Sequence, residues 1–456
     1  MRTLLIFLLP LVSLGTIAQT TMYVGGTTVI VDTIVTGLDI PWEISYGPDN
    51  QIWTTERKGL VSRIDPVSKT KSLILDLTDS VYQSSESGLL GLALHPDFQN
   101  HPEVFLAYTY GSFNAIRERF VKYQFNGNTL ENPVTLLENI VGNTTHIGAR
   151  LHFLPDQTLL VSTGDAQNQA FPQDLNSLSG KILRMNTDGS IPADNPFPSS
   201  YIYSYGHRNV QGIVQAPNGL IYLSEHGATT DDEFQILEPG RNYGWPSVEG
   251  FCDLTGEQNF CAANNVKEPI VEWTPTIAPS DLVWYENSNF PELDRKLLMT
   301  VLKDKKLIAL ELSEDGTQLV SQNHYLTNMF GRLRDICVGP DLELYLATNG
   351  ASWSNTNPNT HSIIRLIPVY PTTTLNQEIK PIKLYPNPAQ DILKVELNQS
   401  WQGDRFYIRD MFGRILIEGD WNQLLKGIST FELAGGKYAL EVRDGARMLG
   451  STTFTK

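Results

Sequence analysis

A histidine and an aspartate nineteen residues apart form the first pair whose chemistry stands out in the chain. His146 opens the stretch HIGAR at residues 146–150, and Asp165 closes the stretch TGD at residues 163–165. A carboxylate beside an imidazole fixes the tautomer of the ring and stabilises its protonated form, as a general base requires. The alternative is a structural histidine, which this stretch favours when it is taken alone.

Two further stretches concentrate polar side chains. YGHRN at residues 205–209 carries four hydrogen-bonding side chains, which are costly to bury unless they meet a polar ligand. SEHGATTDDE at residues 224–233 precedes NYGWP at residues 242–246 and Asp253. Its acids and turn carbonyls suit Ca²⁺, which takes six to eight oxygen ligands, although the spacing is not that of an EF-hand. A solvated loop and an acidic surface turn are the respective alternatives.

A cationic group completes the candidates. Lys303 precedes Arg332 and Arg334, and the alternation of a strand places the two arginines on one face. Like charges on one face repel each other unless an anion lies between them, and guanidinium groups suit carboxylates. A solvated strand edge is the alternative. The sequence contains no GxGxxG dinucleotide loop, no Walker-type phosphate loop and no GxSxG nucleophile elbow.

A recurring pattern indicates the elements that must position these residues. A proline, a polar turn and a β-rich run occur together six times, at Pro48, Pro96, Pro155, Pro217, Pro291 and Pro340. The intervals of 48 to 74 residues suit four-stranded propeller blades with loops of varied length. We therefore expect an all-β fold, a six-bladed β-propeller over residues 30–367, with loops gathered at one end of a central channel. Such turns also occur in other all-β proteins, which is the alternative.

The two ends of the chain differ from the repeating region. Residues 1–18 have a basic start, an apolar run too short to span a bilayer and small residues after it, which predicts a secretory signal peptide. Residues 368–383 are rich in proline and threonine, as linkers are. Residues 384–456 carry short alternating strands of their own, which predict a small C-terminal β-sandwich domain.

Composition narrows the class of protein. The 456 residues include 34 Lys and Arg against 50 Asp and Glu, and the resulting net charge of −16 argues against a nucleic-acid binder. No segment of the sequence has the length and hydropathy of a transmembrane helix, so we expect an exported, soluble protein. Only three cysteines occur. Cys252 and Cys261 could form a disulfide, which would leave Cys337 as a free thiol.

Six motifs in this order resemble the soluble quinoprotein glucose dehydrogenases, also called the glucose/sorbosone dehydrogenases. They are GLLGLALHPDF (88–98), HIGAR, YGHRNVQG (205–212), SEHGATTDDE with NYGWP, TPTIAPS (274–280) and GRLRD (331–335), and the resemblance covers about residues 35–367. The family fold is a six-bladed propeller, and its members oxidise aldose sugars with pyrroloquinoline quinone (PQQ) and Ca²⁺. The resemblance implies a small sugar substrate and an external electron acceptor.

The resemblance also implies a role for each candidate residue. His146 would be the general base, Asp165 would orient it, and Arg208 would stabilise negative charge on the reduced quinone. The residues that would contact the cofactor are Glu86, Asn209, Thr276, Lys303, Arg332 and Arg334.

The implied metal ions are two. Backbone carbonyls of Gly227 and Ala228 would bind the Ca²⁺ that polarises the quinone. A second, structural Ca²⁺ would be held by Asp232, Tyr243 and Asp253. Two features depart from the family pattern: Glu86 stands where glucose-oxidising members have Gln, and the aromatic residue that stacks on the quinone falls at Thr274, with Trp273 one position away.

The C-terminal region resembles the type A sorting domain of the type IX secretion system of Bacteroidota. It carries LYPNPAQDIL (384–393), DMFGRIL (410–416) and GGKYALEV (435–442). The resemblance implies passage through the periplasm of a Gram-negative cell, recognition by the type IX machinery, and a final location outside the cell or on its surface. It implies no part in catalysis.

The leading hypothesis is therefore a secreted, PQQ-dependent aldose dehydrogenase. A non-catalytic carbohydrate- or protein-binding propeller is the main alternative, and it would not need the base, its aspartate and the cations together. A Ca²⁺-dependent lactonase-type hydrolase would need carboxylates that converge on a central metal ion, whereas the acids here cluster in one predicted blade.

Overall fold

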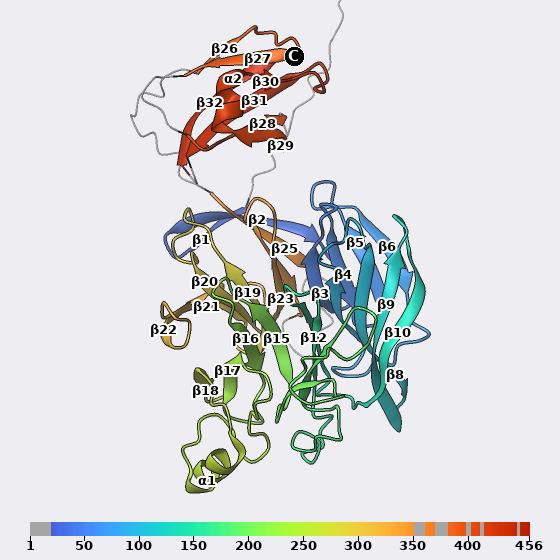
Figure 1. Ribbon diagram of the computed structural model, residues 1–456. Coiled ribbons are helices and arrows are strands. Elements are labelled where there is room, and N and C mark those ends of the chain that lie inside the picture. Colours follow the sequence, from blue (N-terminus) through green and yellow to red (C-terminus); the bar gives the residue numbers. More distant parts are fainter. Residues whose placement is uncertain (1–19, 351–360, 370–381, 398–402, 411–414, 445–446) are drawn as a thin grey trace, which may run out of the picture. The chain divides into compact units, whose positions relative to one another are not determined.

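The computed structural model describes residues 20–350, 361–369, 382–397, 403–410, 415–444 and 447–456. The predicted signal peptide, residues 1–18, and most of the predicted linker, residues 368–383, lie outside the described residues. The chain divides into two compact units, residues 1–370 and 371–456, and each is described by itself (Figure 1).

The described part of the first unit consists of six antiparallel sheets. The first two contain β3 (Pro41–Tyr46), β4 (Ile52–Glu56), β5 (Leu60–Ile64) and β6 (Lys71–Asp76), then β7 (Leu89–Leu94), β8 (Glu103–Ser112), β9 (Ala115–Phe125) and β10 (Leu130–Val141). The third and fourth contain β11 (Gly148–Phe153), β12 (Leu159–Thr163), β13 (Lys181–Met185) and β14 (Ile202–Tyr205), then β15 (Val210–Gln215), β16 (Ile221–Glu225), β17 (Asp232–Leu237) and β18 (Val271–Trp273). The fifth contains β19 (Pro279–Tyr285), β20 (Lys296–Val301), β21 (Lys306–Leu312) and β22 (Leu319–Tyr325). The sixth joins β23 (Leu333–Val338), β24 (Leu344–Thr348) and β25 (Ile363–Pro368) to β2 (Thr27–Val35) and β1 (Thr20–Val24).

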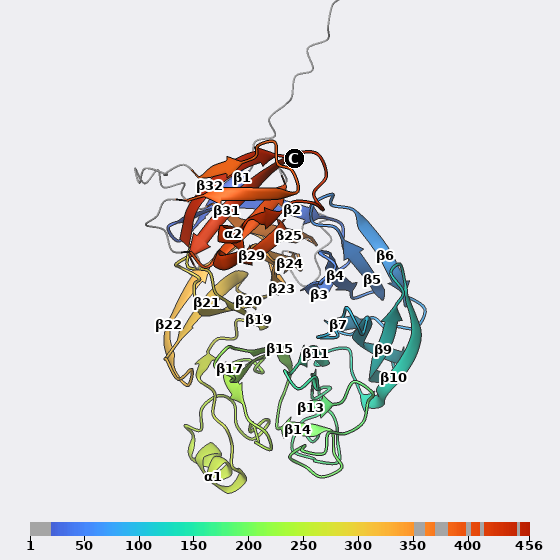
Figure 2. The same cartoon turned by 45° about the horizontal axis from the view of Figure 1, so that its top comes forward.

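The first strands of these sheets contact one another in a closed cycle. β3 contacts β7, and the contacts continue through β11, β15, β19 and β23 back to β3. Figure 2 shows these strands around a common centre, with the later strands of each sheet farther out. Sheets that radiate from one axis are the architecture of a β-propeller.

The strand β2 joins the two ends of the first unit. It pairs antiparallel with β25, and Asp32 lies opposite Arg365. The guanidinium of Arg365 donates to the Asp32 carboxylate at 2.7 Å. Thr20, the first described residue, already pairs in this sheet, ahead of residue 30, where the propeller is predicted to start.

The six repeated prolines lie between the first and second strands of the six sheets. In the turn after Pro48, the Asp49 carboxylate accepts from the Trp53 indole at 3.1 Å, and Asn50 adopts the left-handed conformation (φ 58°) that asparagine tolerates well. These turns mark one end of the sheets. The loops that precede the first strands and those that follow the second strands, where the polar motifs fall, therefore lie at the other end.

The apolar cores lie between neighbouring sheets. The second strands β4, β12, β16 and β24 are buried along their whole length. One cluster joins Tyr222 and Phe234 of the fourth sheet to Leu297 and Met299 of the fifth. Each of these strands begins with apolar residues and ends in a polar one, such as Glu56, Thr163 or Glu225, which is buried as well.

The helix α1 (Thr255–Asn264) lies in the connection between β17 and β18. Cys252 forms a disulfide with Cys261 of this helix, which confirms that predicted pairing, and Cys337 is a free cysteine. None of the helices in the described ranges has both the length and the apolar character needed to cross a bilayer.

The second unit contains two small sheets. One consists of β26 (Lys383–Tyr385), β27 (Ile392–Glu396) and β30 (Ile428–Ser429), and the other of β29 (Ile415–Asp420), β28 (Arg405–Asp410), β31 (Lys437–Asp444) and β32 (Arg447–Thr455). The helix α2 (Trp421–Lys426) begins where the Asp420 carboxylate accepts from Gln423 N at 2.8 Å. Leu393, Phe406 and Leu440 bring both sheets into one buried core.

Candidate active site

Every first strand of the first unit is bulged at the end opposite the proline turns. The pairing register shifts between residues 41 and 43 in β3 and between residues 333 and 335 in β23, and the other four first strands show the same irregularity. A bulge adds a residue to one strand and re-aims the side chains around it. The bulges therefore shape the end of the unit at which the polar motifs lie.

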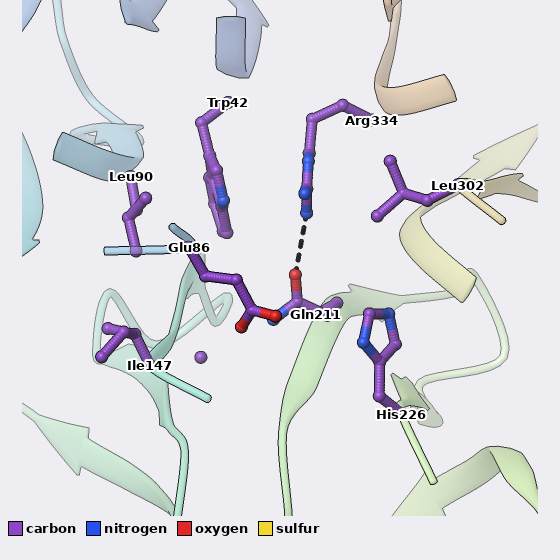
Figure 3. A pocket seen from close by; sticks show the side chains of 9 residues that line it. Trp42, Glu86, Leu90, Ile147, Gln211, His226, Leu302 and Arg334 are labelled. Atoms are coloured by element: carbon purple, nitrogen blue, oxygen red, sulfur yellow. Dashed lines mark hydrogen bonds between the residues drawn. The ribbon is translucent and has the colours of Figure 1, made fainter. Parts of the chain in front are cut away.

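A pocket, here called the first pocket, opens at this end (Figure 3). Strands or loops of all six sheets line it, through Trp42, Glu86, Leu90, Ile147, Gly148, Gln211, His226, Leu302 and Arg334. Figure 3 shows Trp42, Glu86, His226 and Arg334 converging around Gln211, whose Oε1 accepts from Arg334 Nη1 at 2.9 Å. The pocket thus joins an aromatic wall, a carboxylate and a guanidinium.

His146 and Asp165 lie next to each other at the same end. His146 precedes β11 and Asp165 follows β12, and the His146 Nδ1 and Asp165 Oδ1 atoms are 2.8 Å apart. The Asp165 side chain is 2% exposed, and Gln167 N also donates to it at 2.8 Å. Because a carboxylate accepts, Nδ1 of the neutral ring carries the proton, and Nε2 is left as the basic atom.

The backbone of His146 is held closely on both sides. Its φ is 57°, in the left-handed region, and its N–H donates to Glu86 Oε2 at 2.8 Å. A Cβ atom on Gly164 would lie 1.9 Å from His146 O, so only glycine permits this approach of the two loops. Glu86, which the resemblance places at the cofactor, thus also fixes the backbone of the candidate base.

Arg208 and Trp245 complete a ring of contacts around this pair. Arg208 Nη2 lies 3.1 Å from His146 Nε2, and Arg208 Nη1 donates to His226 O at 3.1 Å. The Trp245 indole donates to Asp165 Oδ2 at 2.9 Å, and the Arg208 guanidinium lies 5.4 Å from the centroid of the Trp245 ring. Each of the four side chains therefore holds its neighbour in place.

The predicted cations occupy different settings. Arg334 is 5% exposed, and its Nε has no hydrogen-bond partner among the described residues. Burial, followed by repulsion from Arg332, lowers the pKa of Arg334 to about 9, and burial also lowers the pKa of Arg332. Lys303 is exposed, and its Nζ donates to Thr276 Oγ1 at 2.6 Å. Of these three cations, which all lie in the described part of the chain, Arg334 alone lines the first pocket.

Asn209 is almost fully buried behind the first pocket. Its Oδ1 accepts from Gly148 N at 3.0 Å and from Gln211 Nε2 at 3.2 Å. The predicted residue therefore ties the strand that follows His146 to the strand that follows Arg208.

Several residues that line the two pockets are not among the site residues predicted from the sequence. His226 Nε2 donates to Pro279 O at 2.7 Å, and burial, followed by the charges of Arg334 and Arg208, lowers the His226 pKa to about 3. Trp42, Gln211 and Trp245 also line these pockets and were not predicted as site residues. The quoted motifs contain His226, Gln211 and Trp245, so their positions within those motifs were the available signal, whereas Trp42 falls in none of them.

A second pocket lies beside Arg208. It is lined by Gly206, Arg208, Glu225, His226, Gly227, Asp231, Glu233, Tyr243, Trp245, Val248 and Glu249. Burial, followed by repulsion from Glu225, holds the Glu233 pKa well above its usual value, and burial with the nearby Asp231 raises that of Glu249. Gly227 forms a turn so tight that a Cβ atom would lie 1.9 Å from a backbone carbonyl oxygen, and Ala228 beside it is exposed. An oxygen-rich lining of this kind suits a hard cation.

The residues predicted to hold a second Ca²⁺ do not fit that role. Three backbone N–H groups donate to the Asp232 carboxylate at 2.5–2.8 Å, those of Gly227, Ile277 and Ala278. Burial nevertheless raises the Asp232 pKa to about 6. The Tyr243 hydroxyl donates to a backbone carbonyl at 2.7 Å, and Asp253 is exposed. Within the described ranges, no three His, Cys, Asp or Glu side chains form a group that could hold a metal ion.

The aromatic position of the family pattern also differs from the expectation. Thr274 hydrogen-bonds with Asp231, and the Trp273 indole donates to Gln322 of the next sheet at 3.0 Å. Neither residue lines the first or the second pocket. The aromatic side chains that line the two pockets are Trp42, Tyr243 and Trp245.

Comparison with known proteins identifies relatives of both units. The Glucose / Sorbosone dehydrogenase family matches residues 38–354, and the Secretion system C-terminal sorting domain matches residues 383–452. The aldose sugar dehydrogenase of Escherichia coli is 30% identical over 362 residues, which are 76% of this chain and 96% of that protein. Quinoprotein glucose dehydrogenase B of Acinetobacter calcoaceticus is 36% identical over 266 residues, 51% of this chain and 56% of that protein. The structure of the PQQ-bound aldose sugar dehydrogenase of Streptomyces coelicolor is similar with a TM-score of 0.65 and 31% identity, covering 75% of this chain and 98% of that one.

Proposed function

Because the chain belongs to the glucose/sorbosone dehydrogenase family, we propose that this oxidoreductase converts an aldose-type sugar at C1, with PQQ as its cofactor and Ca²⁺ beside it. The observation that carries the proposal is that the His146–Asp165 pair and the buried Arg334 lie at the same end of the first unit. Oxidation of a hydroxyl group needs a base for the proton and an acceptor for the hydride. The His146–Asp165 pair would supply the base, and Arg334 would hold the quinone that accepts the hydride.

The cationic residues suit a carboxylated quinone. The Nε of Arg334 is buried without a partner among the described residues, and a carboxylate of the cofactor would supply one. Arg332 and Lys303 with Thr276 would meet the remaining carboxylates, and Asn209 and Glu86 would complete the cofactor contacts.

The candidate metal site lies at the turn of the fourth sheet. The acidic lining of the second pocket supports a Ca²⁺ ion held by the backbone carbonyls of Gly227 and Ala228. When bound, the quinone supplies the hydride acceptor and Ca²⁺ polarises it. The proposal leaves out the second Ca²⁺ at Asp232, Tyr243 and Asp253.

His146 would take the proton of the sugar C1 hydroxyl at Nε2. Asp165 holds Nδ1, which fixes the tautomer beforehand and stabilises the imidazolium that forms. Arg208 Nη2 lies 3.1 Å from Nε2, so the substrate hydroxyl would have to displace it. The displaced guanidinium would then face the negative charge that develops at the cofactor.

The proposal also covers the cellular location and the domain architecture of the protein. The match to a secretion sorting domain at residues 383–452 supports export by the type IX machinery. We assign the signal peptide to residues 1–18. We further propose that the protein passes through the periplasm of a Bacteroidota-type Gram-negative cell and is finally located outside the cell or on its surface. We also assign six blades to the first unit and a β-sandwich to the second, and we expect an external electron acceptor to reoxidise the cofactor.

A binding propeller without catalysis is less well supported. Such a module needs neither an aspartate that fixes the tautomer of a histidine nor a buried guanidinium with a free donor. A lactonase-type hydrolase needs carboxylates around a central metal ion, whereas the carboxylates that meet at the centre of the described first unit surround the guanidinium of Arg150.

Reconstitution tests the proposal. The purified protein would be loaded with PQQ and Ca²⁺, and reduction of an artificial electron acceptor would be followed across a panel of aldoses. We expect a bound-cofactor spectrum and turnover with at least one sugar. Absence of both would contradict the proposal and favour the binding module.

A further inference from the structure

Four ionisable side chains meet at the centre of the first unit, and we call them the charge centre. Arg150 of β11 lies with Nη1 2.6 Å from Glu43 Oε2 and 2.8 Å from Asp335 Oδ1, and with Nε 3.5 Å from Asp281 Oδ1. The four side chains are at most 10% exposed. Strands β3, β11, β19 and β23 are thus joined at one point.

The charge centre adjoins the first pocket through Trp42 and Gln211. The guanidinium carbons of Arg150 and Arg334 lie 4.4 Å and 5.7 Å from the centroid of the Trp42 ring. Arg150 Nε donates to Gln211 O at 2.8 Å, and Arg334 Nη1 donates to Gln211 Oε1 at 2.9 Å. A change of charge beside Arg334 therefore alters the electrostatic potential at the charge centre, and the reverse also holds.

The strand bulges explain how the two groups come to lie side by side. Trp42 and Glu43 are consecutive in β3, and Arg334 and Asp335 are consecutive in β23. In a regular strand, consecutive side chains point to opposite faces. Here the register shifts at both positions, and both members of each pair are buried. One member lines the pocket while the next belongs to the charge centre.

One guanidinium does not balance three carboxylates. Burial raises the pKa of Asp281, although the charge of Arg150 opposes the shift. Burial raises the pKa of Glu43 to about 8 and that of Asp335 well above its usual value. Glu43 Oε2 and Asp335 Oδ1 lack a well-directed hydrogen bond among the described residues, despite their short distances to Arg150. The charge centre therefore has more carboxylates than its one guanidinium can neutralise, and burial favours their protonated forms.

We propose that the charge centre takes up a proton when an anion binds beside Arg334. The inference rests on the proposed function for the identity of that anion, a carboxylated quinone. An anion beside Arg334 offsets the positive charge that favours ionised carboxylates nearby, so the carboxylates bind protons more tightly. By linkage, protonation of the charge centre favours the anion in turn.

The other groups that face the charge centre do not titrate in the same range. Burial and the charge of Arg150 lower the His152 pKa to about 4, and burial holds the Cys337 pKa well above its usual value. Three groups face Arg334 from the side of the pocket: His226, whose pKa is lowered to about 3 mainly by burial, and the charged side chains of Arg332 and Glu86. The remaining polar neighbours from adjacent strands are the neutral Thr55, Gln211 and Thr300.

Calorimetric titration of the full chain tests the coupling. Binding enthalpies would be measured at pH 8 in HEPES and in Tris, whose ionisation enthalpies differ. The ligands would be citrate, as a simple tricarboxylate, and, separately, PQQ with Ca²⁺. We expect enthalpies that depend on the buffer and report uptake of up to about one proton. Glu43→Gln should reduce the uptake about twofold or more. Asp281→Asn serves as a second variant, and Glu311→Gln, a partly exposed carboxylate of β21, is the matched control.

Each result decides the matter. Buffer-independent enthalpies in the unaltered protein, or equal uptake in Glu43→Gln, Asp281→Asn and the control, would overturn the coupling. Proton-linked binding of citrate without binding of PQQ would keep the coupling and contradict the proposed function. Failure of both ligands to bind would overturn both. Arg334→Ala, which should abolish citrate binding, shows whether the anion sits at the intended site.

Discussion

The first pocket and the charge centre lie side by side but present opposite electrostatic problems. In the pocket, Arg334 is buried with an Nε that finds no hydrogen-bond partner among the described residues. In the charge centre, Glu43, Asp281 and Asp335 share the single guanidinium of Arg150. A cation without enough acceptors favours an anionic ligand, whereas carboxylates in excess favour protons. Consecutive residues of one bulged strand can therefore serve ligand binding and internal cohesion separately.

Removal of His146 should have the largest effect on the pocket side. His146→Ala should lower turnover by roughly 10²–10⁴-fold, because a positioned base contributes that much, while binding of the quinone persists. Stopped-flow reduction of the reconstituted enzyme and a cofactor titration measure the two quantities. His101→Ala, at the end of the sheets with the proline turns, is the control. A loss below about tenfold, well short of that range, would mean that His146 is structural.

Removal of Arg150 should have the largest effect on the side of the charge centre. Arg150→Met leaves the buried carboxylates without their cation, which should cost about 3–5 kcal/mol in free energy of unfolding. Denaturant unfolding of the cofactor-free protein measures this loss. Arg295→Met, whose side chain is 74% exposed, should change little. Equal stability of the two variants would show that the charge centre does not hold the strands together.

Removal of Arg334 should affect cofactor binding in the first pocket without lowering the stability of the cofactor-free protein. Arg334→Ala removes charge-assisted contacts of about 1.5–3 kcal/mol, which should weaken cofactor affinity roughly ten- to a hundredfold. The cofactor-free variant should be no less stable, because a buried cation repelled by Arg332 is lost. Thermal melts with and without the quinone measure both effects. An unchanged difference between the loaded and cofactor-free melting temperatures would show that Arg334 does not bind the cofactor.

The charge centre should also make stability depend on pH. The folded pKa of Glu43 is about 8, above its usual value of 4.5, so the folded state binds more protons than the unfolded state between these values. Stability should therefore fall as pH rises from 5 to 8, by at most about 1.4 kcal/mol per pH unit for this group. Unfolding across this range checks the slope. Glu43→Gln should flatten it, and an unaltered slope in that variant would assign the effect to another group.

Removal of the second unit should have the smallest effect. Deletion of residues 384–456 should leave turnover and the melting temperature of the first unit unchanged, because the two units have separate apolar cores. Export should fail, with the truncated protein held in the periplasm. Fractionation of cells and calorimetry of the purified protein measure the two outcomes. A lower melting temperature would mean that the units stabilise each other.

Features that depend on residues close together in the chain could be predicted from the sequence. The proline turns, the runs of buried second strands and the short strands of the second unit follow from local patterns, and so does the Cys252–Cys261 disulfide. The order of motifs led to the family. His146 and Asp165 could be paired because two adjacent strands return the chain over nineteen residues.

Contacts that depend on closing the ring of sheets could not be predicted in this way. Glu43 and Asp335 come together across almost the whole first unit, and no local pattern reports that contact. Asp232 is a plausible metal ligand in sequence, but its carboxylate accepts from the distant Ile277 and Ala278. The bulges reverse the alternation by which strand residues are assigned to faces. The physical reason is that long-range contacts and local register shifts, not residue type, decide which buried charges meet each other and which are left for a ligand.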